Sequence, residues 1–178
     1  MITIDGGTGL IMNNGVEVAS EKMVDYWYLN ADITNSDGDT DIPGSKFTRN
    51  DKTGGASQIG TGMTVDNSSG VWTFPTTGKY MIEVHLHNRS NISDNNYLDL
   101  KVTVNGGSDY YSVKRIQSTS SNANAKGHSG SGVYFMNVTD TSQVKIKFFP
   151  HSIDSGSYFE GNDSETLQTV FVFTRLSA

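Results

Sequence analysis

The sequence contains no cysteine, which excludes disulfide frameworks, cysteine-ligated zinc, iron–sulfur clusters and cysteine nucleophiles. Basic residues are also few: 13 Lys and Arg stand against 19 Asp and Glu, the formal net charge is −6, and no basic cluster with interleaved aromatic residues occurs. Nucleic acid is therefore not an expected partner. No apolar run reaches the roughly 18 residues of a membrane span, and residues 1–9 lack the features of a secretory signal. We therefore expect synthesis in a cytoplasm, no signal peptide and no membrane insertion.

Small polar residues dominate what is present. Glycine, serine, threonine and asparagine together make up 73 of the 178 residues, and there are only three prolines. This composition disfavours a helical protein, which would be rich in Ala, Leu, Glu and Lys, and favours short strands joined by many turns. A chain of this length buries about 70% of its unfolded surface. We therefore expect one domain with a true core and a short appendage.

The first 22 residues differ from the rest of the chain. They hold two short apolar alternations, Ile2 with Ile4 and Leu10 with Met12, which glycines separate. Such a segment is too short to fold alone, so we interpret residues 1–22 as an N-terminal arm that leans on the body of the protein or on another subunit. Residues 23–178 then form the main domain.

Strand-like runs follow one another through the main domain, and no long stretch keeps a helical period. Their spacing, with tight turns at residues 105–106 and 140–142, is typical of a β-sandwich rather than of βαβ units. We expect strands at Asp25–Leu29, Lys46–Arg49, Val71–Phe74, Lys79–His87, Tyr97–Val104, Tyr110–Ile116, Gly132–Val138, Gln143–Pro150 and Leu167–Leu176.

The apolar faces of these strands predict how the chain assembles. Residues 98–104 and 144–148 alternate apolar with polar side chains, so each strand buries one face and leaves the other in water. Val133–Met136 and Val170–Phe173 are apolar on both faces, which is typical of strands covered on both sides. A chain without helices has little of its own to supply the second cover, so we expect another copy of the chain to supply it. The alternative is that the arm or the polar stretch Asn35–Gly62 covers these faces within one chain.

A family resemblance begins at residues 70–82, which read Gly70-Val-Trp-Thr-Phe-Pro75-Thr-Thr-Gly78-Lys-Tyr80-Met-Ile82. This run resembles the signature of the complement-1q and tumour-necrosis-factor superfamily, in which a glycine, an aromatic residue and Thr precede a Pro, a Gly and a Tyr. Later segments agree in order: Leu98–Gly106, Ser131–Tyr134 with Asp140 and Val144, and Thr166–Phe173. Two positions depart from the pattern. Thr169 stands where a glycine is usual and Leu167 where an aromatic residue is common, so the packing at the trimer axis stays open.

The resemblance implies an all-β fold, a two-sheet antiparallel jelly-roll sandwich over residues 23–178 that forms homotrimers through its inner sheet. It places the strands that are apolar on both faces in the inner sheet and the alternating strands in the outer sheet. Side-chain parity then puts Tyr80, Ile82, Val84 and Leu86 in the core. The residues expected at the threefold interface are Met81, Glu83, His85, His87, Val133, Phe135, Leu167, Phe171 and Phe173.

Within that superfamily, Ile59–Thr64 and Ser69–Pro75 look most like virion proteins of marine tailed phages. The resemblance implies a non-enzymatic trimeric module at the virion surface, serving as capsid decoration, as a fibre tip or in attachment to a host glycan or protein. The arm would contact other virion proteins, and the long polar loops Asn35–Gly62, Ser118–Gly130 and Ser152–Glu165 would make the recognition contacts. One alternative is a capsid cement without a host ligand. Another is a tail-associated polysaccharide-degrading enzyme.

Candidate ligand and catalytic residues are few. Asp37, Asp39 and Asp41 could supply oxygen ligands to calcium, but EF-hand spacing is absent, so a solvated turn is the favoured interpretation. His85 and His87 share a strand face with Glu83. In a trimer they could line an axis and bind a metal or an anion, although hydrogen bonding across an interface is the favoured interpretation. No nucleophile elbow, P-loop or His-Glu-x-x-His motif occurs, so we expect neither enzymatic activity nor a cofactor.

Overall fold

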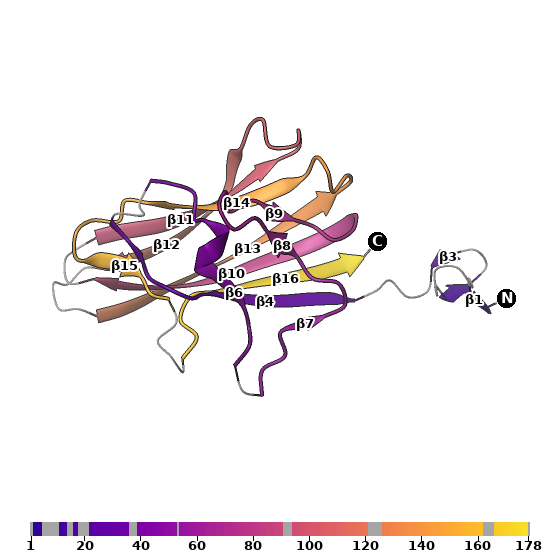
Figure 1. Ribbon diagram of the computed structural model, residues 1–178, viewed down its shortest axis with the longest axis horizontal. Helices are drawn as coiled ribbons and strands as arrows, with labels where there is room; N and C mark the ends of the chain where they lie inside the picture. Colours follow the sequence, from indigo (N-terminus) through magenta and orange to yellow (C-terminus); the bar gives the residue numbers. More distant parts are fainter. Residues whose placement is uncertain are drawn as a thin grey trace.

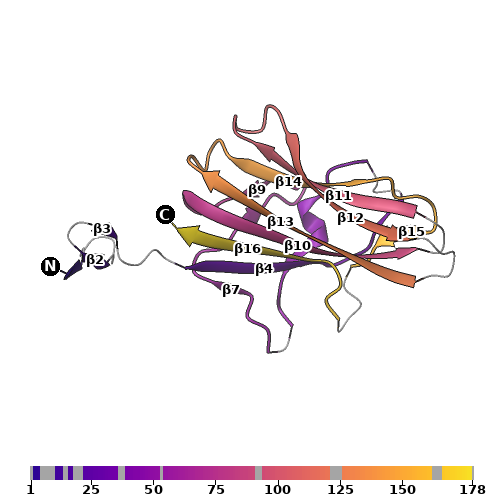
Figure 2. The ribbon, with the colours of Figure 1, turned by 180° about the vertical axis from the view of Figure 1, so that it is seen from behind.

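The computed structural model describes residues 2–4, 11–13, 16–17, 22–35, 39–52, 54–90, 94–120, 126–161 and 166–177. This part of the chain is built almost entirely from β-strands, with the short 3₁₀ helix η2 (Gly44–Lys46) in one connection (Figures 1 and 2). Within these ranges, no helix combines the length and the apolar character that a membrane span requires.

Two antiparallel sheets form the sandwich, and a small third sheet lies apart from it. The larger sheet has eight strands. Six of them follow the order β5 (Ile33–Thr34), β15 (Ser157–Phe159), β10 (Gly78–Ser90), β16 (Val170–Ser177), β4 (Met23–Leu29) and β6 (Phe47–Arg49), while β13 (Lys126–Val138) pairs with β10 and β7 (Gln58–Ile59) pairs with β4. The five-stranded sheet has the order β12 (Tyr111–Ser120), β11 (Asp94–Thr103), β14 (Lys145–His151), β9 (Trp72–Thr73) and β8 (Thr64–Val65).

The third sheet lies at the N-terminus and consists of β1 (Ile2–Ile4), β2 (Ile11–Asn13) and β3 (Val16–Glu17). In Figures 1 and 2 it lies beyond the N-terminal end of β4, away from the sandwich. The division of the chain into an arm of residues 1–22 and a domain of residues 23–178 stays a prediction.

The predicted fold class, an all-β sandwich of two antiparallel sheets, is confirmed. The alternating strands at residues 98–104 and 144–148 correspond to β11 and β14 of the five-stranded sheet, and the strands that are apolar on both faces correspond to β13 and β16 of the eight-stranded sheet. The short strands β5, β7, β8 and β15 are not among the predicted strands. Two to three residues give too little side-chain alternation to reveal a strand.

Aromatic side chains fill the space between the two sheets. Trp72 is fully buried at the centre, where its ring lies 5.0 Å from those of Trp27 and Phe47 and 4.9 Å from that of Phe173. The ring of Phe148, in the five-stranded sheet, lies 4.6 Å from that of Phe171, in the eight-stranded sheet. The contacts of Trp72 with Trp27 and Phe47 are edge-to-face, and those with Phe173 and between Phe148 and Phe171 are tilted. Such aromatic contacts stabilise a core beyond the area that they bury. The predicted core residues of β10 are all buried here, namely Tyr80, Ile82, Val84 and Leu86.

The signature run of residues 70–82 builds the corner between β9 and β10. Gly70 has a φ of +67°, and a Cβ there would collide with the carbonyl oxygen of Ile42, so only glycine fits. Trp72 and Phe74 enter the core, and the Tyr80 hydroxyl donates a hydrogen bond of 2.8 Å to the carbonyl oxygen of Thr76. The signature therefore consists of the residues that turn the chain from one sheet into the other.

An ion pair between a buried aspartate and a half-buried arginine ties β4 to β6. Asp25 is fully buried and accepts hydrogen bonds from Arg49 Nε at 2.7 Å and from the backbone N–H of Met63 at 2.6 Å. The Arg49 guanidinium also lies 4.4 Å from the centre of the Trp27 ring. Because Asp25 has these partners, its carboxylate can be buried at the end of the aromatic core, while Arg49 stays partly in contact with water.

The structure corrects two predicted interface residues, Phe171 and Phe173. Both are fully buried in the core of a single chain. The strand register places Phe173 opposite Ile82 and Phe171 opposite Val84, and residues that face each other across antiparallel strands lie on the same side of the sheet. Their placement at the threefold interface is therefore wrong. Because β16 is apolar on both faces, its sequence could not show which face lies inward.

We therefore expect Phe173→Ala to lower the free energy of unfolding by about 3–5 kcal/mol, the usual cost of removing a buried aromatic ring. Urea denaturation at fixed chain concentration measures this change. Thr174→Ala, at the next position on the opposite face of β16, is the matched control and should have a small effect. Equal effects of the two substitutions would contradict the assigned parity of β16.

Candidate functional site: the outward face of the eight-stranded sheet

The eight-stranded sheet has one face against the core and one face directed away from it, which we call the outward face. The register of β10 with β13 and β16 sets its rows of side chains. Met81 lies between Phe135 and Thr174, and in the next row Glu83 lies between Val133 and Val172. On the far side of β16, Val172 pairs with Tyr26 and Thr174 with Val24 of β4. Residues from four strands therefore share this face.

The outward face is apolar and partly exposed. Phe135 is 63% exposed, Leu176 49% and Val133 42%. Met81, Val172, Val24 and Tyr26 are half-buried, and Ile59 of β7, opposite Val24, is exposed. Burial raises the pKa of the Tyr26 phenol above its ordinary value. A monomeric protein rarely leaves such a set of neighbouring apolar side chains in water.

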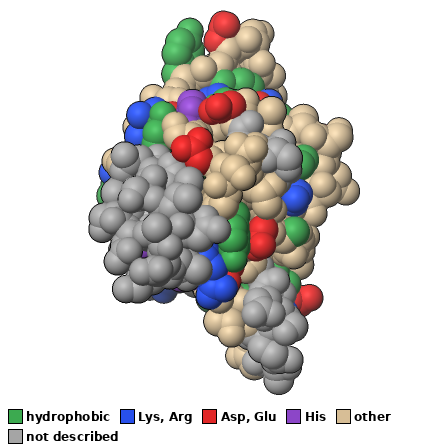
Figure 3. Space-filling model, turned by 90° about the vertical axis from the view of Figure 1, so that its left-hand side faces the viewer, with side chains coloured by type: hydrophobic (Ala, Val, Ile, Leu, Met, Phe, Trp, Pro, Cys, Tyr) green, Lys and Arg blue, Asp and Glu red, His purple; other side chains and the backbone are tan. Residues whose placement is uncertain are grey.

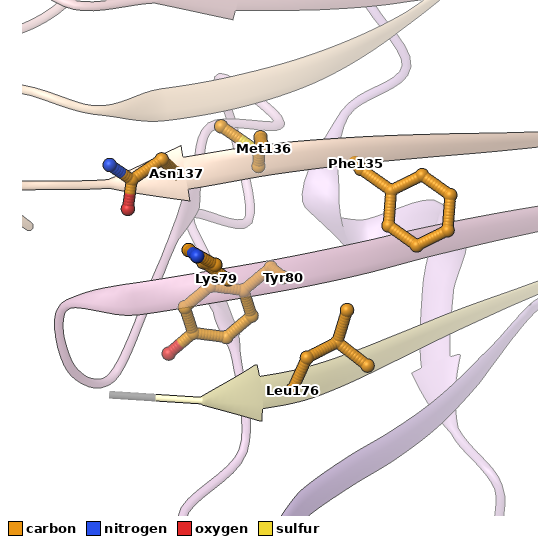
Figure 4. Close-up of a pocket in the computed structure, with 6 residues that line it drawn as sticks. All are labelled: Lys79, Tyr80, Phe135, Met136, Asn137 and Leu176. Atoms are coloured by element: carbon orange, nitrogen blue, oxygen red, sulfur yellow. The ribbon is translucent and has the colours of Figure 1, made fainter.

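A groove of about 210 Å³ lies at one end of the outward face. Figure 4 shows its lining side chains, from β13, β10 and β16: Lys79, Tyr80, Phe135, Met136, Asn137 and Leu176. Phe135 comes from β13 and Leu176 from β16, the two strands that flank β10, and these two side chains form the apolar part of the groove walls. Lys79 and Asn137 lie at the other end of the groove. An apolar side chain of a partner would fit such a groove.

The other end of the outward face is polar. His85 is exposed, and its neighbour on β13 is Ser131. The Nδ1 atom of His87 lies 2.8 Å from Oε2 of Glu160, close enough for an ion pair, although the angle is not that of a hydrogen bond. Glu160 follows β15 directly and is not among the predicted site residues. His87 therefore contacts Glu160 rather than Glu83. Glu83, His85 and His87 occupy alternate positions of β10 and so share one face of the sheet, as predicted, and their place at a trimer axis stays a prediction.

The predicted aspartates lie on the opposite side of the molecule, over the five-stranded sheet. Asp41 contacts two ammonium groups, Lys147 Nζ at 2.8 Å and Lys101 Nζ at 3.9 Å, and Asp39 lies 3.3 Å from His151. Asp37 lies outside the described residues. A carboxylate held by two lysines is poorly placed to bind calcium, and nowhere in the described ranges do three His, Asp or Glu side chains group so as to hold a metal ion.

A paired carboxylate also lies on the surface of the five-stranded sheet. The side chain of Asp99 is almost fully buried and accepts bonds of 2.9 Å and 3.1 Å from Arg115, while His151 Nε2 lies 3.3 Å away. Arg115 lies over the ring of Tyr97 at 3.8 Å. Burial opposes ionisation of Asp99, but hydrogen bonds from Arg115 and Ser112 outweigh it and hold the pKa of Asp99 below its ordinary value. The charged groups named on this face therefore have their partners within the same chain.

Three further exposed apolar residues, none of them among the predicted interface residues, lie on or beside the hairpin of β11 and β12. Val104 is 70% exposed, Tyr111 is 65% exposed, and Val113 is also exposed. Tyr111 pairs with the core residue Val102, so its side chain lies on the core side of the sheet but at the end of the hairpin. The signal in the sequence was Val104 and Tyr111, two apolar residues that flank a polar turn. We call these three residues the hairpin patch.

The end of the sandwich opposite the N-terminus has a different character. Figure 3 shows that its described surface is mostly polar side chains and backbone, with small separate hydrophobic areas. The predicted recognition loops are only partly described, because residues 36–38, 53, 121–125 and 162–165 lie outside the described ranges. Leu167 is half-buried, and its placement at an interface stays a prediction, as do those of Met81, Glu83, His85, His87, Val133 and Phe135.

Comparison with known proteins identifies structures of similar fold but no protein of similar sequence. No family model matches the sequence, and no curated protein matches it either. Among solved structures, the tumour-necrosis-factor protein Eiger from S. frugiperda is similar with a TM-score of 0.62 and 11% identity, covering 89% of this chain and 94% of that one. Murine APRIL is similar with a TM-score of 0.55 and 11% identity, covering 87% of this chain and 99% of that one. The chain therefore shares the jelly-roll fold of tumour-necrosis-factor proteins.

The lowered pKa of Asp99 predicts a contribution to acid unfolding. A carboxylate whose pKa is lower in the folded state stabilises the fold above its unfolded pKa, and this stabilisation is lost as pH falls through the folded pKa. We expect the free energy of unfolding to fall between about pH 5 and pH 2, and Arg115→Gln to make that fall smaller. Arg175→Gln is the control, because Arg175 donates to the Thr77 carbonyl. Parallel pH profiles of wild type and Arg115→Gln would refute the assignment.

Proposed function

We propose that this protein is a non-enzymatic module that works as a homotrimer, with the outward face of the eight-stranded sheet buried between copies. The observation that carries the proposal is the row of exposed apolar side chains Val133, Phe135 and Leu176 on that face. Burial of each side chain of this size stabilises an assembly by about 1.5–3 kcal/mol. Left in water, they would forgo an energy comparable to the 5–15 kcal/mol by which a typical domain is stable.

A closed ring needs two different complementary patches on each copy, because each contact is head-to-tail. The outward face is one such patch, and the hairpin patch of Val104, Tyr111 and Val113 is the other. An aromatic side chain such as Tyr111 fits the groove beside Phe135 and Leu176 in size and chemistry. Apart from this hairpin, the five-stranded sheet offers no comparable apolar surface in the described residues, since its charges pair with one another. We therefore propose that the hairpin patch of one copy packs on the outward face of the next.

The number three rests on the family resemblance, which implies homotrimers, and on the shared fold of the tumour-necrosis-factor proteins. The setting that we propose is a virion surface, where three identical copies would raise the affinity for a host glycan or protein. Its support is the resemblance of residues 59–64 and 69–75 to phage virion proteins. A capsid cement without a host ligand is the rival role.

Light scattering of point variants tests the interface. We expect Phe135→Ser and Tyr111→Ser each to weaken association by at least about tenfold, since each loses roughly 1.5–3 kcal/mol per contact. Phe149→Ser is the matched control, because Phe149 lies on the far face of the five-stranded sheet under Lys101. If all three variants keep the wild-type mass on dilution, the outward face is not the interface.

Binding of the purified protein to host cells and glycan arrays separates the two roles. An attachment module should bind a defined cell type or glycan, and dissociated Phe135→Ser should bind more weakly because it loses multivalency. No binding to any plausible host, with an intact trimer, would favour the cement role.

A further inference from the structure

Glu83 stands in an apolar part of the outward face. It is half-buried, and its neighbours across the strands are Val133 on β13 and Val172 on β16. In the part of the chain that the structure describes, its carboxylate has neither a hydrogen bond nor an ion pair, whereas Asp25 and Asp99 are both paired with arginines. A carboxylate that is buried further without a partner loses its hydration and opposes the contact that buries it.

His85 is the next residue on the same face of β10. Its imidazole is exposed, its neighbours across the strands are Ser131 and Val170, and within the described ranges it too has no hydrogen bond or ion pair. His87, one step further along this face, already contacts a carboxylate. Glu83 and His85 are therefore neighbouring oxygen and nitrogen ligands that nothing else in the described chain uses.

The outward face has no basic side chain beside Glu83 in its described residues. On the same face of β10 the nearest lysine or arginine is Lys79, about 13 Å away along the strand. Arg89, further along in the other direction, lies 3.7 Å from Glu160. Beyond the valine on β16, the next side chain is that of Tyr26 on β4, a neutral phenol whose pKa burial raises. Once this face is buried, a positive charge for Glu83 has to come from another copy or from solution.

The geometry of the proposed ring brings three copies of this pair together. β13 is the edge strand of the outward face, and a Cβ on its Gly130 would collide with the carbonyl oxygen of Gln117 in β12, the strand that carries part of the hairpin patch. The two contact surfaces of each copy therefore meet along β13. In a closed ring every copy is a wedge whose two contact surfaces meet on the side of the rotation axis. The axis then runs along β13 and its neighbour β10, where Glu83 and His85 lie.

We infer that Glu83 and His85 of three copies form a divalent-cation site at the axis of the trimer. The inference rests on the proposed homotrimer and deepens it, because the described part of a single chain holds no complete set of ligands. Carboxylates and imidazoles together suit a transition-metal ion such as Zn²⁺, whereas Ca²⁺ and Mg²⁺ prefer oxygen ligands alone. The bound ion neutralises the carboxylates that association brings together, and it binds only to assembled copies.

The metal content of the purified, untagged trimer tests the site. After loading with Zn²⁺ and removal of the excess, the trimer should hold about one Zn²⁺ per three chains. Glu83→Gln and His85→Asn should each lower the affinity for Zn²⁺ by at least about tenfold. Asp66→Asn, in the turn between β8 and β9, is the matched control and should leave the affinity unchanged. EDTA should lower the temperature at which the wild-type trimer dissociates but not that of Glu83→Gln.

The outcomes separate this inference from the proposed function. A trimer of confirmed mass that retains no Zn²⁺, or retains it equally after Glu83→Gln, overturns the site and leaves the trimer standing. A trimer that EDTA does not affect, and that Glu83→Gln makes harder to dissociate, also overturns the site, because Glu83 is then a charge without a cation. A chain that is monomeric both with and without Zn²⁺ overturns the site and the proposed function together.

Discussion

A β-sheet presents alternate side chains on two faces, so a sheet that is apolar on both faces needs two covers. The rest of this structure depends on that constraint. The five-stranded sheet and the aromatic cluster around Trp72 cover one face of the eight-stranded sheet completely. The other face carries Val133, Phe135 and Leu176, and no described part of the chain covers them. The core of the sandwich is therefore complete within one chain, but apolar side chains on the second face of the eight-stranded sheet stay exposed in a single copy.

The solvent-facing surfaces of the two sheets differ in polarity, so the two sides of the molecule are chemically distinct. On the five-stranded sheet, Asp99 pairs with Arg115 and Asp41 with Lys147. Such a face is stable in solvent without a partner. On the eight-stranded sheet the corresponding face carries Val133, Phe135 and Met81, and the charged residues at the same parity of β10 are Lys79, Glu83 and Arg89. Association through the apolar sheet leaves the paired charges and the polar loops available for recognition.

Much of the fold could be predicted from the sequence, and the failures have physical causes. The signature of residues 70–82 could be recognised because each residue has a local structural role at the corner between the sheets. Gly70 adopts a positive φ beside the Ile42 carbonyl, Trp72 fills the core, and the Tyr80 hydroxyl donates a hydrogen bond to the Thr76 carbonyl oxygen. Strand parity was readable in β10 and β11, where polar and apolar residues alternate, but not in β16, which is apolar throughout; hence Phe171 and Phe173 were assigned to the wrong face. The pairing of His87 with Glu160 joins strands far apart in sequence, and no local pattern encodes it.

Sedimentation equilibrium of the unmodified chain at submicromolar concentration tests the central claim most directly. A chain of 19.3 kDa whose second apolar face is covered by its own copies should sediment as one species of three times that mass and resist dissociation on dilution. A stable species of 19.3 kDa that keeps its fold, with Phe135 in contact with water, would contradict the account.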